Sequence, residues 1–430
     1  MTTRVQLLAI GCFVCVTPLS AQGVSHYDRD RVLVMLRAAR KDLEEHYYDT
    51  TFRGVNLASH WDSAETVIRA AQSNNQMFGI IAWALMGLED SHTLFLPPAR
   101  VDHVQYGWEL EMVGETCFVI DADPDVSLAP ERPAPGDQVL RVGPFVPNRR
   151  DFWKIAYWFQ VISPQEVVPF VLRSPGGAVR QVNAQAKVIP GKQVMDLTGG
   201  SDIWDLIRRA ENEERELAFR FVEFEKRALV WRMPTFSVDD GDIDRAIGKA
   251  DDFPALILDL RGNRGGAERE LLRLLGAFSD HPDTIGTLQR RDQRVPLVVT
   301  PGRSFRGKLV VLVDSRSASA AEIFAAVIQM RERGAVLGDR TWGGVMRSRT
   351  YSHQLGIDRV AFYGFSISDA AILLADGSRL EGNGMTPREI LLPTAADLAA
   401  GRDPVLSRAL ALVGIEMSPE QAGHLFPKLH

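Results

Sequence analysis

The sequence predicts an α/β protein of two or three domains, and three observations lead to this expectation. The chain has 430 residues, of which 45% are hydrophobic and 24% charged, as in ordinary globular proteins. Apolar residues recur at three- and four-residue steps near the N-terminus, and short β-type runs separated by Pro, Gly and Asp follow them. After residue 226, buried-type strands alternate with helical segments, as expected for parallel strands with crossover helices.

Composition and charge exclude several classes of protein. Lys and Arg number 49 against 55 Asp and Glu, giving a net charge of -6, and no long basic run is present. Nucleic-acid binding depends on clustered positive charge, so we expect no nucleic-acid partner. Gly (35) and Pro (23) occur at average frequency, which argues against a large low-complexity region.

The first 21 residues have the layout of a secretory signal peptide. Arg4 is the only charge among the first 25 residues and precedes an apolar run over residues 5–19, which ends at Ser20 and Ala21. We expect cleavage after Ala21 and a periplasmic or extracellular protein. The run is shorter than the ~20 residues of a spanning helix, and no second such run follows, so we expect no membrane span in the mature chain.

Cysteine usage is consistent with a mature chain without internal disulfides. Cys12 and Cys15 would leave with the signal peptide, and Cys117 then stands alone. A lipid anchor at Cys12 is the weaker alternative, because the apolar run continues well past it.

The segments are predicted in order as follows. Residues 22–100 form an N-terminal helical region, because the apolar residues of 32–43 repeat at helical spacing, and two more helices are expected over 63–72 and 75–88. Residues 101–190 form a β-rich module with strands at 117–120 and 138–142. A charged helical connector is expected over 191–225.

The α/β core is predicted over residues 226–415, followed by a C-terminal tail over 416–430. Strands at 255–258 and 309–313 are each followed by a helical pattern, over 268–278 and 320–330.

The first of two strand-to-helix joints in this core is residues 258–266 (LDLRGNRGG). It lacks the Gly-x-Gly-x-x-Gly of dinucleotide sites and the Gly-Lys-Ser/Thr of phosphate loops. The glycines allow backbone N–H groups to approach a ligand closely, so an oxyanion-binding turn and a purely structural turn both remain open.

The second joint is residues 313–322 (VDSRSASAAE). A serine at the start of a helix can act as an acyl-transfer nucleophile, since its hydroxyl lies near free N–H donors. Ser317 or Ser319 could instead cap the helix together with Glu322, which is the commoner use of serine at such a position.

Taken together, the two joints resemble the signature of the tail-specific, or C-terminal-processing, serine peptidases. Residues 259–266 and 317–323 (SASAAEI) carry the resemblance. Four further segments are similar to family segments in the same order: 88–93 (LEDSHT), 136–143 (GDQVLRVG), 231–236 (WRMPTF) and 381–387 (EGNGMTP). The resemblance implies a crotonase-like α/β core, with an N-terminal helical region and a PDZ-like module that would bind an extended peptide by strand addition.

The same resemblance implies roles for individual residues. Ser319 would be the nucleophile, and the backbone N–H groups of Gly265 and Ala320 would form the oxyanion hole. The best-known branch of the family activates its serine with a lysine after a Thr-aromatic-Gly motif. Here that segment is 341–345 (TWGGV), and no lysine occurs between Lys308 and Lys428, so a Ser-Lys dyad at the usual place is excluded.

The lysine-free branch of the family, which includes tricorn-like cores, supplies the alternative base. His92, preceded by Ser91, and Glu381 match its histidine and glutamate positions. A neutral histidine is a suitable general base, and a carboxylate acting through Ser91 could orient it. His353 is the second candidate for the base, and a purely structural role of His92 at its helix end is the alternative.

We therefore expect an exported serine peptidase that acts on peptides or proteins through a Ser319 acyl-enzyme. No cofactor is implied, and no metal, because the sequence has no His-Glu-x-x-His and no histidine cluster at ligand spacing. The alternatives are a catalytically silent relative that binds peptides or small apolar ligands, and another acyl-transfer enzyme on the same core. The oligomeric state is not predicted.

Overall fold

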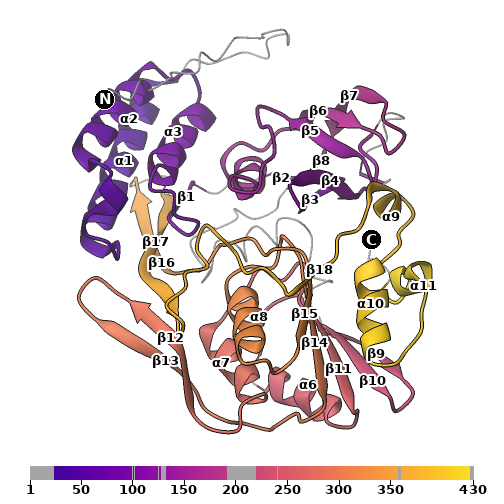
Figure 1. The fold of residues 1–430 in the computed structure, drawn as a ribbon. Helices are drawn as coiled ribbons and strands as arrows, with labels where there is room; N and C mark the ends of the chain where they lie inside the picture. Colours follow the sequence, from indigo (N-terminus) through magenta and orange to yellow (C-terminus); the bar gives the residue numbers. More distant parts are fainter. Residues whose placement is uncertain are drawn as a thin grey trace, which may run out of the picture.

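The structure is a computed structural model of the chain (Figure 1). It describes residues 24–98, 100, 102–123, 125–126, 132–190, 219–239, 241–356 and 360–426. The expected signal peptide and most of the expected connector at 191–225 lie outside these residues. Residues 228–426 form a mixed α/β unit, and the N-terminal helices and a β-rich module lie above it in Figure 1.

Three helices build the N-terminal region, as the apolar spacing predicts: α1 (His26–His46), α2 (Leu57–Ala70) and α3 (Asn74–Met86). Helix α2 begins six residues before the expected start, because the Asn56 side chain accepts the Ser59 N–H and caps the helix there. A short turn of 3-10 helix, η1 (Phe52–Gly54), joins α1 to α2.

The β-rich module is an antiparallel sheet in the order β3-β4-β5-β6-β7, with a helical segment packed on it. Phe159 of that segment and Phe170 of the sheet are both buried in the core of the module. The strands and helical turns are β3 (Glu109–Val113), β4 (Thr116–Asp121), β5 (Gln138–Val142), α4 (Trp153–Ala156), η2 (Tyr157–Ile162), β6 (Val167–Arg173) and β7 (Val179–Gln185). Strands β2 (His103–Gln105) and β8 (Lys187–Ile189) pair beside it.

The sheet of the α/β unit has the order β18-β15-β14-β11-β10-β9, and all its pairs are parallel except β9 with β10. The expected parallel strands are thus confirmed. The expected helix at 191–225 is wrong for its last residues, because strand β9 occupies them and pairs with β10. The strands are β9 (Arg220–Phe224), β10 (Ala228–Arg232), β11 (Ala255–Asp259), β14 (Lys308–Val313), β15 (Ala335–Gly338) and β18 (Glu389–Ile390).

Helices cover both faces of this sheet. One face packs on α6 (Asp242–Ala250), α7 (Glu268–Gly276) and α8 (Ala320–Met330), which are the crossover helices. The other face packs on α10 (Pro404–Leu412) and α11 (Pro419–Gly423). Helix α9 (Ala395–Ala399) follows β18 and contacts strand β4 of the β-rich module. Because both faces are covered, the strands are near-continuous apolar runs.

A second sheet connects the N-terminal helices to the α/β unit, and the sequence did not predict it. It contains β1 (Leu94–Leu96), β12 (Asp283–Gln289), β13 (Arg294–Val299), β16 (Met346–Leu355) and β17 (Ala361–Leu374). Strand β17 pairs with β1, β12 and β16, and its apolar residues pack into the core of the N-terminal helices. Strand β1, which begins two residues after His92, and strand β16, which begins directly after Val345, both pair with β17 in this sheet.

Candidate active site

Ser319 lies at the sharp turn between strand β14 and helix α8. Its backbone has φ 52° and ψ -118°, which is strained for a residue with a side chain. Its N–H donates to the Gly344 carbonyl (3.0 Å) and to Glu322 Oε2 (3.1 Å). Gly265 packs directly on it, since a Cβ placed on Gly265 would come within 2.6 Å of Ser319 Cβ. The two glycine- and serine-rich joints of the sequence thus meet in space.

Ser317, the other serine of this joint, has a structural role. Its side chain is fully buried, and its Oγ donates to the Leu260 carbonyl at 2.8 Å and accepts the Asp314 N–H at 3.0 Å. These bonds tie the end of β14 to the end of β11. Ser319, in contrast, forms a capping box with Glu322 at the start of α8, so the capping role considered from the sequence is present alongside any catalytic one.

The carboxylate of Glu322 is a fully buried acceptor beneath Ser319. It accepts from Thr341 Oγ1 (2.5 Å) and from the N–H groups of Gly343 (2.7 Å) and Gly344 (3.0 Å), besides that of Ser319. Burial raises the pKa of Glu322 to about 8, and these four hydrogen bonds act in the opposite direction. Glu322 thereby fixes the 341–344 turn to the start of α8. From the sequence alone, Glu322 was predicted only as a possible helix-capping residue.

His92, Ser91 and Glu381 form a continuous hydrogen-bonded chain, although Glu381 lies 290 residues from Ser91 in the sequence. Ser91 Oγ lies 2.7 Å from His92 Nδ1 and donates to Glu381 Oε2 at 3.1 Å. Glu381 Oε1 also accepts the Ser91 N–H at 3.0 Å. All three residues are largely buried, and burial together with the charge of Asp90 raises the pKa of Glu381.

Asp90 fixes the backbone of the segment that contains Ser91 and His92. The sequence did not predict this role of Asp90. Its Oδ1 accepts the N–H groups of His92 (3.0 Å) and Thr93 (3.1 Å) and the hydroxyl of Ser368 (2.7 Å). Its Oδ2 accepts the Tyr47 hydroxyl at 3.0 Å, and burial beside this carboxylate raises the pKa of Tyr47. The backbone at His92 is therefore fixed by four donors on one buried carboxylate.

The turn at residues 341–345 links the serine to the histidine chain. Its Gly344 carbonyl accepts the Ser319 N–H at 3.0 Å. The next residue, Val345, donates its N–H to Glu381 Oε2 at 2.7 Å. Adjacent residues of one short turn thus contact the serine and the carboxylate, so this turn connects Ser319 with the Glu381–Ser91–His92 chain.

The two backbone groups expected to bind an oxyanion differ in their surroundings. The Ala320 N–H, in the first turn of α8, has no hydrogen-bond acceptor among the residues that the structure describes. The Gly265 N–H donates to Asn263 Oδ1 at 2.8 Å. Asn263 is fully buried and also binds the Met233 carbonyl, so its amide is held in place.

His353, the second candidate base, lies elsewhere. Its Nε2 is 2.7 Å from Asp42 Oδ2 of helix α1, and its ring stacks on Tyr363. It is seven residues along β16 from Met346, or about 23 Å at the usual rise of a strand. His353 is thus paired with helix α1, whereas His92 is connected through Ser91 and Glu381 to the turn that binds Ser319.

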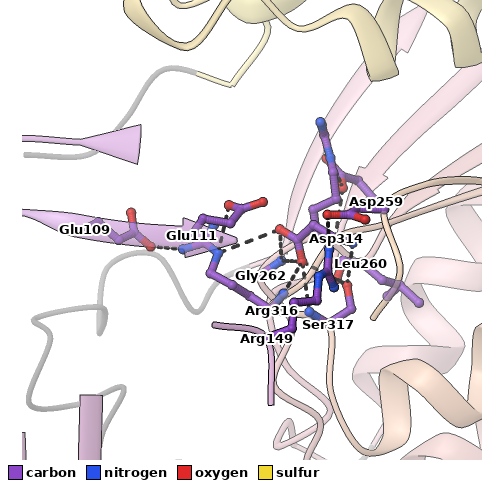
Figure 2. Close-up of polar contacts among 11 residues, drawn as sticks. Glu109, Glu111, Arg149, Asp259, Leu260, Gly262, Asp314, Arg316 and Ser317 are labelled. Carbon is purple, nitrogen blue, oxygen red and sulfur yellow. Dashed lines mark hydrogen bonds and ion pairs between the residues drawn. The ribbon is translucent and has the colours of Figure 1, made fainter. Parts of the chain in front are cut away.

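The turn that leads to Ser319 also contacts the β-rich module (Figure 2). Arg316 points at Glu109 and Glu111 of β3, forming an ion pair with the first and lying 3.2 Å from the second. Asp314 accepts the Gly262 N–H with both oxygens, at 3.0 Å each. Burial, followed by the charge of Asp314, raises the pKa of Glu111 well above its ordinary value. The module is thus joined to the serine turn through charged groups.

The described residues contain no group of three or more His, Cys, Asp or Glu side chains that could hold a metal ion. No helix in the described ranges combines the length and the apolar character needed to cross a membrane.

Comparison with known proteins relates part of the chain to a peptidase family. Residues 228–390 match the description of peptidase family S41. The chain is 30% identical over 295 residues to the tail-specific protease of Haemophilus influenzae, a match that covers 63% of this chain and 39% of that protein. It is 35% identical over 170 residues to the putative tricorn protease homolog 2 of Streptomyces coelicolor, covering 39% of this chain and 14% of that protein. The chain therefore spans less than half the length of either relative.

A solved structure has a similar fold. Mature CPAF complexed with lactacystin has a TM-score of 0.64 and 16% sequence identity, with 87% of this chain and 96% of that chain covered. At 16% sequence identity, this structural similarity shows a shared fold only. The match of residues 228–390 and the named relatives confirm the resemblance found in the sequence: these residues match peptidase family S41, and the chain is similar to tail-specific and carboxyl-terminal-processing proteases.

Proposed function

We propose that this protein is a serine peptidase that cleaves peptides or proteins through an acyl-enzyme on Ser319, with His92 as its general base. The observation that carries the proposal is the hydrogen-bonded chain from Glu381 through Ser91 to His92, which reaches the turn that binds Ser319. A structural serine at a helix start would not need a buried histidine and carboxylate assembled from a segment 290 residues away.

The hydrogen bonds indicate which nitrogen of His92 acts as the base. The single hydroxyl hydrogen of Ser91 points to Glu381, because an ionised carboxylate can only accept. Ser91 Oγ must then accept from His92, so Nδ1 carries the proton and Nε2 is left with a free lone pair. Nε2 is thus the atom that would take the Ser319 proton. When the ring becomes positively charged, Glu381 stabilises it through Ser91.

The reaction then follows the acyl-transfer sequence. Ser319 Oγ attacks the substrate carbonyl carbon while its proton moves to His92 Nε2, and an oxyanion forms. The oxyanion expels the amine, which takes the proton from His92, and water releases the acyl group by the reverse proton path. The Ala320 N–H is available to bind the oxyanion. The Gly265 N–H would assist after exchanging Asn263 Oδ1 for the oxyanion.

The wider assignments extend this proposal. The α/β unit would be a crotonase-like core, supported by its parallel sheet and by the crossover helix α8 that follows Ser319. The module of β3 to β7 would be PDZ-like, supported by its antiparallel sheet and packed helical segment, and would bind an extended peptide by strand addition. The signal-like pattern of residues 1–21 supports export to the periplasm or the exterior, which N-terminal sequencing of secreted protein would test.

Labelling with a fluorophosphonate probe tests the core of the proposal. We expect labelling of the wild type, none of Ser319→Ala, and at least a hundredfold slower labelling of His92→Ala, because only an activated serine reacts. His353→Ala is the matched control and should label at the wild-type rate. If the folded wild type does not label, or if Ser319→Ala labels equally, the proposal fails and a peptide-binding relative without activity becomes the better description.

A further inference from the structure

A buried tyrosine of the N-terminal helices is connected to the backbone of His92. Tyr47 is the residue at which helix α1 ends, and its side chain is fully buried. Its hydroxyl donates to Asp90 Oδ2 at 3.0 Å, while Asp90 Oδ1 accepts the N–H of His92 at 3.0 Å. Two hydrogen bonds on a single carboxylate therefore connect helix α1 with the candidate base.

The carboxylate of Asp90 joins three segments that are far apart in the sequence. Its Oδ1 also accepts the Thr93 N–H at 3.1 Å and the Ser368 hydroxyl of strand β17 at 2.7 Å. The Ser368 carbonyl in turn accepts the Tyr48 N–H, just beyond the end of α1, at 3.0 Å. Asp90, Thr93 and Ser368 are fully buried. A buried polar network whose members are paired makes its surroundings rigid, so α1, residues 90–93 and β17 are held at one point.

The position and the protonation of Tyr47 are both fixed by its surroundings. Its ring packs in the core of the N-terminal helices, with the ring of Tyr48 at 4.9 Å and that of Phe52 at 6.1 Å between centroids. Burial, followed by the charge of Asp90, raises the pKa of Tyr47. The phenol therefore keeps its proton and remains a hydrogen-bond donor to the carboxylate.

A second contact from the N-terminal region reaches the residues just before Asp90. Arg53, in the short turn η1, donates to the Glu89 carbonyl and to the Leu88 carbonyl at 3.5 Å. The backbone at Phe52 and Arg53 has φ 50° and 54°, which residues with side chains seldom adopt. Strain of this kind persists where the surroundings over-determine the backbone, and it is common at functional sites. The turn that follows Tyr47 is thus also attached to the segment of His92.

The charge of Asp90 gives this network a reason beyond packing. A buried carboxylate is costly to desolvate, and apolar side chains of similar volume would hold the three segments together without that cost. Asp90 is near the histidine chain, since burial and then the charge of Asp90 raise the pKa of Glu381. A negative charge there favours the positive ring that forms when His92 takes a proton.

We propose that Tyr47 is a positioning residue for the peptidase reaction, which acts through Asp90 to hold His92 where it can take the proton of Ser319. The inference rests on the proposed peptidase function and gives the N-terminal helices a part in that function. Because Tyr47 acts through Asp90, loss of its hydroxyl should slow the chemical step and leave substrate binding nearly unchanged.

Tyr47→Phe tests the inference, because it removes the hydroxyl and keeps the ring that fills the core. We expect fluorophosphonate labelling, and kcat on a cleaved peptide, to fall about tenfold to a hundredfold, with little change in KM. Tyr106→Phe, in the β-rich module, is the matched control. Its hydroxyl donates to the Phe159 carbonyl (3.3 Å) and accepts the Gln165 N–H (2.9 Å), so its loss should lower stability and leave labelling unchanged.

A double-mutant cycle shows whether the effect passes through Asp90. In the Asp90→Asn background, Tyr47→Phe should slow labelling by less than about twofold, since the carboxylate that it orients is already gone. Wild-type labelling by folded Tyr47→Phe, or the same slowing in both backgrounds, would overturn the inference.

Hydrogen exchange separates the inference from the proposed function. In Tyr47→Phe the backbone amides of residues 92 and 93 should exchange about tenfold faster than in wild type, whereas Tyr106→Phe should leave them unchanged. A folded wild type that does not label contradicts the proposed function. Exchange at residues 92 and 93 would still decide whether Tyr47 holds this segment, and an unchanged rate in Tyr47→Phe would contradict the inference by itself.

Discussion

Glu322 accepts the backbone N–H of Ser319 at 3.1 Å, and the same carboxylate binds the turn at residues 341–344. One buried side chain therefore sets the position of the candidate nucleophile relative to Val345, and through Val345 relative to Glu381. The turn therefore supplies a backbone N–H to Glu381, which in turn accepts from Ser91.

Glu322→Ala should remove activity and destabilise the fold. The substitution leaves the N–H groups of Gly343 and Gly344 buried without acceptors, at a cost of about 3 kcal/mol in the free energy of unfolding. Fluorophosphonate labelling and chemical denaturation would measure the two effects. Glu332→Gln, at an exposed glutamate paired with Arg388, is the control and should behave as wild type. Wild-type labelling by Glu322→Ala would show that the 341–344 turn is not needed to position Ser319.

The sequence contained enough information to find the serine joint and the parallel sheet. Residues 313–322 combine a buried strand, small residues and a helix start, and each feature has a local physical cause. The N-terminal helices could be predicted because their apolar residues repeat at helical spacing. The helical expectation failed at Arg220–Phe224 because the pairing of β9 with β10 outweighs the local preference of a charged segment.

The partners of the serine could not be derived from local patterns. Ser91 and Glu381 meet only because β17 pairs with β1 and so brings two distant segments together. Strand β16 was missed because its burial hardly alternates, and several of its residues are polar. The family resemblance supplied His92 and Glu381, whereas the roles of Asp90 and Glu322 depend on hydrogen bonds that only the folded chain shows.

Ser91→Ala should slow the chemical step while leaving substrate binding nearly unchanged. Without the hydroxyl, His92 Nδ1 loses its acceptor and Glu381 can no longer stabilise the charged ring. We expect kcat to fall roughly tenfold to a thousandfold with little change in KM. Steady-state kinetics on a cleaved peptide would check the split between kcat and KM, and a purely structural Ser91 would leave kcat near the wild-type value once the variant is shown to be folded.

Glu111→Gln should flatten the pH dependence of stability. Burial, followed by the charge of Asp314, raises the pKa of Glu111 well above 4.5, so the folded state holds a proton that the unfolded chain releases. The stability associated with this protonated group is present below about pH 4.5 and is lost as the pH rises towards the raised pKa. Urea denaturation at pH 5, 6, 7 and 8 would show a smaller decline for Glu111→Gln than for wild type. An identical decline would show that Glu111 ionises freely beside Arg316.

Ser319→Gly should be more stable than Ser319→Ala, although both lack the nucleophile. The backbone at this position has φ 52° and ψ -118°, which glycine adopts readily and alanine does not. Neither variant can form an acyl-enzyme. The difference between their free energies of unfolding therefore reports the backbone strain at residue 319. We expect the glycine variant to exceed the alanine variant by about 1 kcal/mol in the free energy of unfolding, after allowing for the greater freedom of glycine in the unfolded chain. Urea denaturation would measure the difference, with Ala318→Gly as the control in which glycine should only destabilise. If Ser319→Gly is the less stable of the pair, then the turn holds Ser319 without strain, and its geometry would reflect helix capping more than preparation for catalysis.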